Sequence, residues 1–171
     1  MLSRFNEKRQ VIECGYAYLF ADNRSISGCE PGWFKDGNSC YLFHFKSTRV
    51  WRNARNACHK LSADLVVVNN ESTLEFLAKQ RREMELDGHS LYIGLSSKLR
   101  WIWLDGENVS DGYSLWSPGQ PDGDGRCGTL LRDVTWGFKW LWNDMSCTRR
   151  NFAYGYICEQ PLGVLCNKFL C

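Results

Sequence analysis

Nine cysteines constrain the fold of this chain more than any other feature of its sequence. They stand at positions 14, 29, 40, 58, 127, 147, 158, 166 and 171. Cysteines are this frequent in a reduced cytosolic domain only when they bind metal. Zinc modules usually pair their cysteines closely, and the wide spacing here favours disulfides over zinc. The sequence therefore predicts a disulfide-stapled domain of a protein that is secreted or stands on the extracellular face of a cell.

The length and charge of the chain exclude several classes of protein. Its 171 residues fit a single domain with short tails. The 21 basic and 19 acidic residues leave a net charge of +2, without the basic stripe that binds a phosphate backbone, so nucleic acid is not an expected partner. No apolar run approaches the roughly 20 residues that cross a bilayer, and the N-terminus has no signal-peptide pattern. We therefore expect no membrane span, and either a removed signal or a fragment.

Three N-x-S sequons agree with passage through a secretory compartment, where asparagine is glycosylated. They begin at Asn23, Asn70 and Asn108. Such short patterns also arise by chance, and Asn70 could equally cap the start of a helix. The sequence thus predicts a glycoprotein and leaves the modified asparagine open.

The N-terminal part of the chain predicts an extension followed by a helix. Residues 1–28 show no sustained period, and the domain is expected to start near Cys29. Further along, apolar residues recur at spacings of three and four with polar residues between them, which is the period of an amphipathic helix. They are Trp51, Ala54, Cys58 and Leu61. This face is expected to pack inward.

The rest of the chain predicts one more helix and then strands. A short buried strand at 64–68 precedes a helix that opens at Asn70 or Glu71 and stops at Gly88. After Leu91 the chain changes to short segments rich in aromatic and β-branched residues, separated by turns that contain glycine or proline. Helices first and strands later predict an α+β fold.

A dense series of motifs follows in fixed order along most of the chain. It comprises Cys29-Glu30-Pro31-Gly32-Trp33-Phe34, Cys40-Tyr41, Trp51-x-x-Ala54-x-x-x-Cys58, Tyr92-Ile93-Gly94-Leu95, Trp101-x-Trp103-x-Asp105-Gly106, Trp116-x-x-Gly119-x-Pro121, Trp142-Asn143-Asp144-x-x-Cys147 and Tyr156-Ile157-Cys158-Glu159. In kind and order these motifs resemble the C-type lectin-like domain family. The resemblance implies a domain at 29–159 with two helices packed on short antiparallel sheets, a long loop region and disulfide staples. Residues 160–171 would form a C-terminal tail that contains cysteines.

The resemblance also implies the disulfide pairing, which the cysteine count alone leaves open. It pairs Cys29 with Cys40, Cys58 with Cys158, and Cys127 with Cys147. The remaining Cys14, Cys166 and Cys171 are odd in number, so at least one is free or bonded to another chain. A disulfide-linked homo-oligomer and a local clamp between the tails both stay open.

The resemblance further implies one calcium ion between two neighbouring loops. Calcium prefers about six to eight oxygen ligands from carboxylates, amide carbonyls and the backbone. Gln120 and Asp122 would face Asn143 and Asp144 across the ion, and Asp144 would add its backbone carbonyl. Coordination positions left open would accept two adjacent sugar hydroxyls, to which the same side chains would hydrogen-bond. These four residues are therefore the expected ligands of both the ion and the sugar.

The order of donor and acceptor in the first loop predicts the kind of sugar. Gln120 donates through its amide N–H, whereas the carboxylate of Asp122 only accepts. The Gln-Pro-Asp order resembles the family's galactose-type site, and the reverse polarity of Glu-Pro-Asn resembles its mannose-type site. Galactose-type glycans, including N-acetylgalactosamine, are thus the first expected ligands, and mannose-type glycans the second.

Two features depart from the family pattern. The family usually has a further acidic ligand shortly before the cysteine that matches Cys127, where this chain has Gly125 in a shortened loop. Asp124 or a water molecule would then take that place. Galactose-binding members often follow Gln-Pro-Asp with an aromatic residue that stacks on the sugar, whereas this chain continues Gly-Asp-Gly-Arg. Trp136 or Trp140 could supply a platform instead, although tryptophans in this family are mostly core.

No motif supports an enzyme. The histidines His44, His59 and His89 are dispersed, and the sequence lacks the nucleophile-elbow, zinc-protease and phosphate-loop patterns. Without the family context the loop at 120–125 would be an ordinary turn. The same fold also serves calcium-independent protein receptors, and fold alone does not choose between the two. The expected function is calcium-dependent carbohydrate binding, with a calcium-independent protein-binding receptor domain as the alternative.

Overall fold

The computed structural model describes residues 28–48, 50–84, 90–109, 112–133, 139–148 and 154–162. Their elements follow in the order β1, β2, α1, β3, α2, β4, β5, β6, β7 and β8. Several residues named above lie outside these ranges. They are Cys14, Cys166, Cys171, Trp136, Asn23, Gly88 and His89.

One sheet runs through the described residues in the order β1-β2-β8-β4-β6-β7, with β3 beside β8 and β5 beside β4. Its strands are β1 Phe34–Asp36, β2 Ser39–Thr48, β3 Asp64–Leu65, β4 Leu91–Ser97, β5 Trp101–Trp103, β6 Cys127–Asp133, β7 Lys139–Met145 and β8 Tyr154–Pro161. The pairings are antiparallel except that of β4 with β8, which is parallel. The first long strand thus pairs with the last, and β7 lies at one edge of the sheet.

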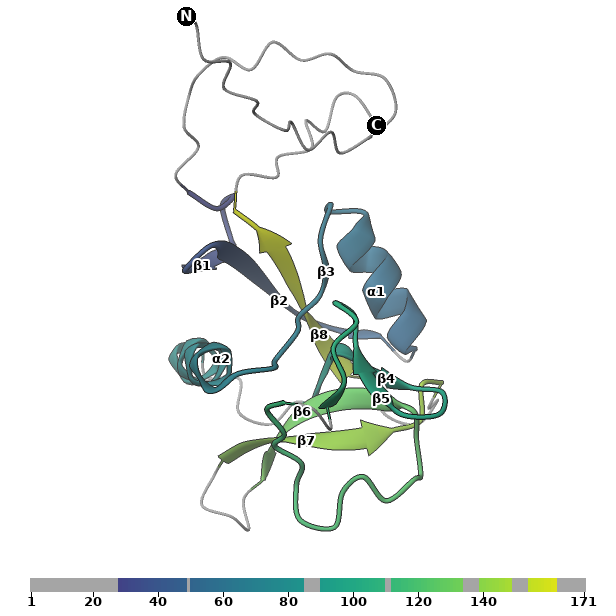
Figure 1. Ribbon diagram of the computed structural model, residues 1–171. Helices are drawn as coiled ribbons and strands as arrows, with labels where there is room; N and C mark the ends of the chain where they lie inside the picture. The colour runs from purple at the N-terminus through teal and green to yellow at the C-terminus, as the bar shows by residue number, and fades with distance from the viewer. Residues whose placement is uncertain are drawn as a thin grey trace, which may run out of the picture.

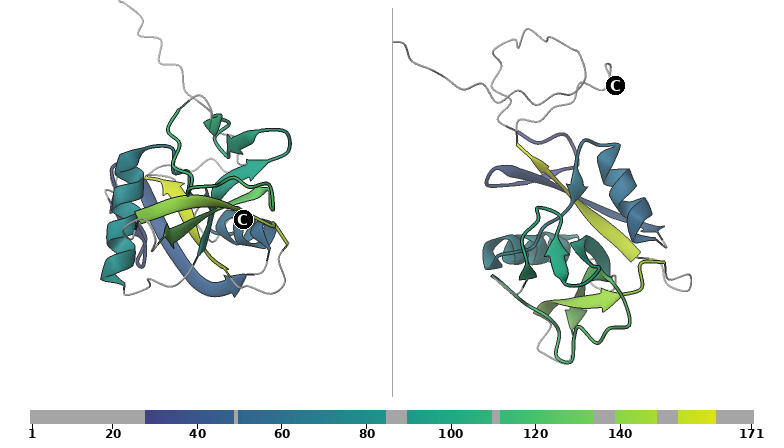
Figure 2. Two further views of the ribbon diagram at one scale, coloured as in Figure 1. Left: turned by 90° about the horizontal axis from the view of Figure 1, so that it is seen from below. Right: turned by 45° about the vertical axis from the view of Figure 1, so that its right-hand side comes forward.

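Two helices flank the central β2–β8 pair. Their bounds are Trp51–His59 for α1 and Glu71–Glu83 for α2. The three views agree that the helices lie on opposite sides of this pair (Figure 1 and Figure 2). Helix α1 buries Ala54 and Cys58, as the apolar spacing predicted. Helix α2 begins where the side chain of Asn70 accepts the backbone N–H of Thr73 at 2.9 Å, which confirms the cap.

Two element boundaries differ from the sequence prediction. The strand expected at 64–68 pairs only over Asp64–Leu65, although Val66 and Val68 are both buried. Helix α2 ends at Glu83, several residues before the expected stop. Apolar residues therefore predict which side chains are buried better than they predict which residues pair in a strand. Strand pairing also depends on which partner strand lies alongside.

Three disulfides confirm the pairing that the resemblance implied. They join Cys29 to Cys40, Cys58 to Cys158, and Cys127 to Cys147. Cys58 and Cys158 are each 0% exposed and connect α1 to β8 across a sequence separation of 100 residues. The bridge from Cys127 joins the start of β6 to the segment that follows β7, at the edge of the sheet where the candidate site lies.

A cluster of tryptophan rings supports the long loop between β5 and β6. Trp142 is 0% exposed, and its ring packs edge to face with Trp103 and Trp116 at centroid distances of 5.1 and 5.8 Å. The backbone of Trp142 also holds the loop, since its N–H donates to the Leu115 carbonyl and its carbonyl accepts the Ser117 N–H, each at 2.8 Å. Strand β7 therefore fixes the loop that carries the candidate site.

Candidate functional site

The loop before β6 is clamped at both ends by backbone hydrogen bonds. At its start the N–H of Gln120 donates to the carbonyl of Ser117 at 2.8 Å. At its end the N–H of Arg126 donates to the Met145 carbonyl at 3.1 Å, and the Arg126 carbonyl accepts the Ser97 N–H at 2.9 Å. Figure 1 shows the loop in green beside β7. The residues between the clamps therefore lie against the end of β7.

The buried carboxylate of Asp144 accepts hydrogen bonds from the backbone of this loop. Its side chain is 0% exposed, and its carboxylate accepts the backbone N–H groups of Asp122, Gly123 and Gly125 at 3.1, 3.0 and 3.4 Å. The sequence predicts Asp144 only as a ligand on a surface loop. The structure shows instead a buried residue at the end of β7, whose charge is balanced by backbone dipoles.

Three carboxylates converge at this place. One carboxylate oxygen from each of Asp122, Asp124 and Asp144 lies within 4.8 Å of the others, and the first two side chains are exposed. Oxygen ligands at about 2.3–2.6 Å from a calcium ion lie no more than about 5 Å apart. The spacing and hardness of these donors therefore fit calcium. Asp124 thus lies beside two of the residues that were expected to bind calcium.

The side-chain amides of Gln120 and Asn143 form hydrogen bonds with acidic residues of this cluster. Gln120 donates through Nε2 to Asp122 Oδ2 at 3.3 Å, and its Oε1 accepts the Asp122 N–H at 3.3 Å. Asn143 donates through Nδ2 to the backbone carbonyl of Asp144 at 2.8 Å. A carbonyl oxygen has a second lone pair, so this bond leaves Asp144 O able to bind a cation. Gln120 thus lies beside Asp122 in the acidic cluster, and Asn143 contacts the backbone of Asp144, its neighbour in β7.

Gly125 passes too close to β7 to carry a side chain. A Cβ atom at this position would lie 1.9 Å from the carbonyl carbon and 2.1 Å from the carbonyl oxygen of Met145. The acidic residue that the family usually has here could not be accommodated with this loop path. The path of the shortened loop therefore requires a glycine at position 125.

Gly125→Ala is expected to destabilise the domain by about 1–3 kcal/mol and to weaken calcium binding, because the backbone must move away from β7. Gly112→Ala is a matched control, since a Cβ there meets nothing within 4 Å. Thermal unfolding and calcium titration of both variants test this. Equal unfolding midpoints would show that the loop relaxes without cost.

Trp140 lies in the core and not at this site, which corrects the expectation that it could contact a sugar. Its side chain is 4% exposed, and the guanidinium of Arg81 from α2 lies over the ring, 3.8 Å from its centroid. The ring is therefore covered by a neighbouring helix. An exposed stacking platform must come from elsewhere.

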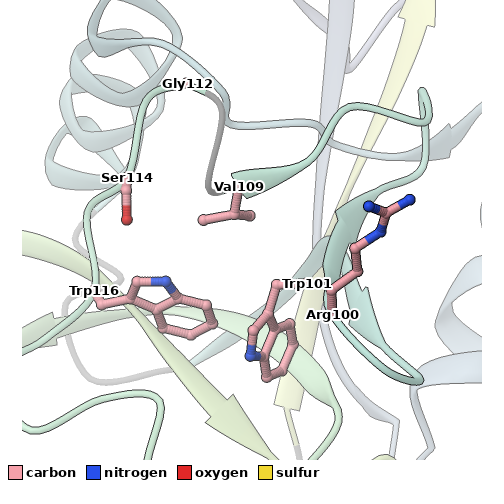
Figure 3. A pocket seen from close by; sticks show the side chains of 6 residues that line it. All are labelled: Arg100, Trp101, Val109, Gly112, Ser114 and Trp116. Carbon is pink, nitrogen blue, oxygen red and sulfur yellow. The ribbon is translucent and has the colours of Figure 1, made fainter.

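Two other tryptophans line a hollow in the long loop region, which the sequence analysis did not identify. The hollow has a volume of about 490 Å³ and is lined by Arg100, Trp101, Val109, Gly112, Ser114 and Trp116. The rings of Trp101 and Trp116 meet edge to face with centroids 4.9 Å apart, and Figure 3 shows both below the hollow, with the guanidinium of Arg100 directed away from them. Their spacing in the sequence does not distinguish them from the buried tryptophans.

Tyr113 fastens the same loop region to α2. Its hydroxyl donates to Glu71 Oε2 at 2.6 Å, and its ring packs edge to face on Trp142 at 5.6 Å. Burial raises the pKa of Tyr113 above its usual range, and the hydrogen bond and charge of Glu71 raise it further. The phenol is therefore a protonated donor at neutral pH.

Comparison with known proteins identifies the family. The sequence pattern of the Lectin C-type domain matches residues 47–160. The chain belongs to the C-type lectin domain family. Membership confirms the predictions of a C-type lectin-like fold and of a binding domain that is not an enzyme. Among the described residues, none of the helices has the length and apolar character needed to cross a membrane.

Individual relatives support the same assignment. The domain is 33% identical to mouse (Mus musculus) C-type lectin domain family 6 member A over 78% of the chain and 61% of the relative. It is 31% identical to human (Homo sapiens) C-type lectin domain family 10 member A over 89% of the chain and 46% of the relative. A solved SPL-1 complex with GlcNAc superposes with a TM-score of 0.66 at 30% identity, covering 78% of this chain and 96% of that one. The chain therefore spans less than two thirds of the length of these two relatives, whereas the match covers nearly all of the solved SPL-1 chain.

Proposed function

We propose that this domain binds carbohydrate through one calcium ion held by Asp122, Asp124 and Asp144, with Gln120 and Asn143 completing the site. The observation that carries the proposal is the convergence of the three carboxylates within 4.8 Å of one another. Two of them are exposed, and the third, Asp144, is buried and accepts three backbone N–H groups of the loop. Such a preformed, one-sided arrangement suits an ion that must also accept ligand oxygens from solution.

The residues of the site would have different roles in binding. When bound, calcium would offer coordination positions to two neighbouring sugar hydroxyls. Asp144 keeps the loop in place through its three backbone partners. Gln120 Nε2 and Asp122 Oδ2 lie 3.3 Å apart, so one donor and one acceptor stand side by side at the exposed surface. This pair would orient the hydroxyls and set the preference for galactose-type glycans.

The comparisons support a carbohydrate ligand in general. The SPL-1 structure, a complex with GlcNAc, is 30% identical to this chain. The cow CD23 carbohydrate-recognition domain, solved in the presence of GlcNAc2Man3 oligosaccharide, is 27% identical and superposes with a TM-score of 0.63. The sugars in these two structures are GlcNAc and GlcNAc2Man3 oligosaccharide rather than galactose. The galactose preference therefore rests on Gln120 and Asp122, and the extracellular location rests on the disulfides and the family.

A calcium-independent protein-binding receptor domain is the second candidate. The observation that favours it is the carboxylate of Asp144, whose oxygens already accept three backbone N–H groups. Gly125 also leaves no room for the acidic side chain usual in the family. Retention on galactose and mannose resins, with calcium and with chelator, separates the two functions. Retention on galactose that chelator releases supports the lectin, whereas no retention on either resin favours the receptor.

The double variant Gln120→Glu with Asp122→Asn is expected to move preference from galactose to mannose, because it reverses donor and acceptor. The overall fold should persist, since both side chains lie at the loop surface. The ratio of retention on the two resins measures the change, and wild type and each single variant serve as controls. An unchanged ratio would show that this pair does not select the sugar.

We also expect Cys14, Cys166 and Cys171 to form a covalent dimer or a clamp between the tails, because their number is odd outside the three observed bridges. Non-reducing electrophoresis and peptide mapping of the natively secreted protein distinguish the two arrangements. Three free thiols in that material would rule out both.

A further inference from the structure

We propose that Asn70 carries an N-linked glycan and that the same side chain continues to cap α2. The inference rests on the extracellular location proposed above and is independent of the calcium site. Asn70 begins the sequon Asn70-Glu71-Ser72, and both Asn70 and Ser72 are exposed. A sequon at a helix cap poses a chemical question, because capping and glycosylation both use the side-chain amide.

The hydrogen bonds around Asn70 fix which way its amide points. Its Oδ1 accepts the N–H of Thr73 at 2.9 Å, and a backbone N–H can only face an acceptor. Its Nδ2 donates to Asn69 Oδ1 at 3.1 Å. The amide of Asn69 is oriented in turn, because its Nδ2 faces the carboxylates of Asp105 at 3.3 Å and Glu107 at 2.8 Å. The capping oxygen of Asn70 therefore points to the helix, and its nitrogen points away from it.

The two functions use different atoms of this amide. Nδ2 carries two hydrogens, and Asn69 accepts one of them. Among the described residues no group accepts the other, and the side chain is exposed. Replacing that hydrogen by a sugar leaves Oδ1 for Thr73 and one N–H for Asn69. Both observed bonds can therefore persist in the glycosylated protein.

The modification itself is a glycosyl transfer in the secretory compartment. The donor is an oligosaccharide bound to a lipid diphosphate. The bond between its anomeric carbon and the phosphate oxygen breaks, and the lipid diphosphate leaves with the electron pair. The anomeric carbon forms a new bond to Nδ2, which loses one proton.

Asn108 provides a contrast within the same chain. Its side chain is only partly exposed, its Oδ1 is buried, and its backbone forms a bridge with Ile102. The start of α2 is the more open of these two positions. The proposal is therefore specific to Asn70.

The test is to express the chain behind a cleavable secretory leader in animal cells and to analyse all material recovered from cells and medium. We expect peptide:N-glycosidase F to increase the electrophoretic mobility of the wild type and to leave Asn70 converted to aspartate in the peptide mass spectrum. Ser72→Ala should lose this modification while keeping the cap. Wild-type protein in which the Asn70 peptide is unmodified overturns the proposal, whatever the sugar-binding result.

A second measurement tests that cap and glycan share one residue. After treatment with peptide:N-glycosidase F the wild type carries aspartate at position 70, so it should unfold at the same temperature as Asn70→Asp. Ser72→Ala, which keeps asparagine there, should unfold at nearly that temperature, because asparagine and aspartate are both good N-caps. Asn70→Ala should unfold at a lower temperature because the Thr73 N–H loses its acceptor. An Asn70→Ala protein as stable as Ser72→Ala would contradict the dual role.

Discussion

Replacing Asp144 by alanine is expected to abolish calcium binding and sugar retention and to loosen the loop above it. The side chain is 0% exposed and accepts the N–H groups of Asp122, Gly123 and Gly125. A buried donor left without its acceptor costs about 1–3 kcal/mol. Because water can reach part of this loop, we expect a total loss of about 2–4 kcal/mol in the free energy of unfolding.

Asp144→Asn is the matched control, because it keeps the volume and one acceptor oxygen but removes the charge. It should lose calcium binding and remain closer to the wild type in stability. Calcium titration measures the first property and urea unfolding the second. The interpretation of the site fails if Asp144→Ala binds calcium as the wild type does.

Removing the bridge between α1 and β8 is expected to have the largest effect on stability. The double variant Cys58→Ala with Cys158→Ala opens a loop whose ends are 100 residues apart. In the chain-entropy model this costs about 5 kcal/mol, comparable with the whole stability of many domains. The cavity left by two fully buried sulfur atoms adds to the loss. We therefore expect little folded protein in the medium.

The matched control removes the short bridge by Cys29→Ala with Cys40→Ala, whose ends are 11 residues apart. The same relation gives about 3 kcal/mol for that loop, so this variant should retain more folded protein. Urea unfolding and secreted yield compare the two variants. A Cys58 and Cys158 double variant as stable as the wild type would refute the structural role of the long bridge.

Local patterns predicted much of the fold. The inward face of α1 follows from apolar residues at helical spacing, and Ala54 and Cys58 are both buried. The cap of α2 follows from the preference of asparagine for that position, and Asn70 makes the expected bond to Thr73. The three disulfides came from motif resemblance, since counting cysteines leaves many pairings open.

Long-range packing could not be predicted in the same way. Trp140 was a candidate for sugar contact because the sequence does not show that Arg81 from another element covers its ring. The burial of Asp144 was missed because its backbone partners lie about twenty residues away in sequence. The parallel pairing of β4 with β8 likewise joins distant segments. The sequence left the place of the missing acidic ligand to Asp124 or to water, and the structure brings a carboxylate oxygen of Asp124 within 4.8 Å of those of Asp122 and Asp144.

Calorimetric titration of the wild-type domain with calcium tests the central claim most directly. We predict saturable binding of one ion with a dissociation constant of about 0.1–1 mM, the range of weak extracellular sites, because the loop is rich in glycine and few carboxylates surround the ion. The heat should be lost in Asp144→Asn. The absence of any binding heat at millimolar calcium would contradict the account.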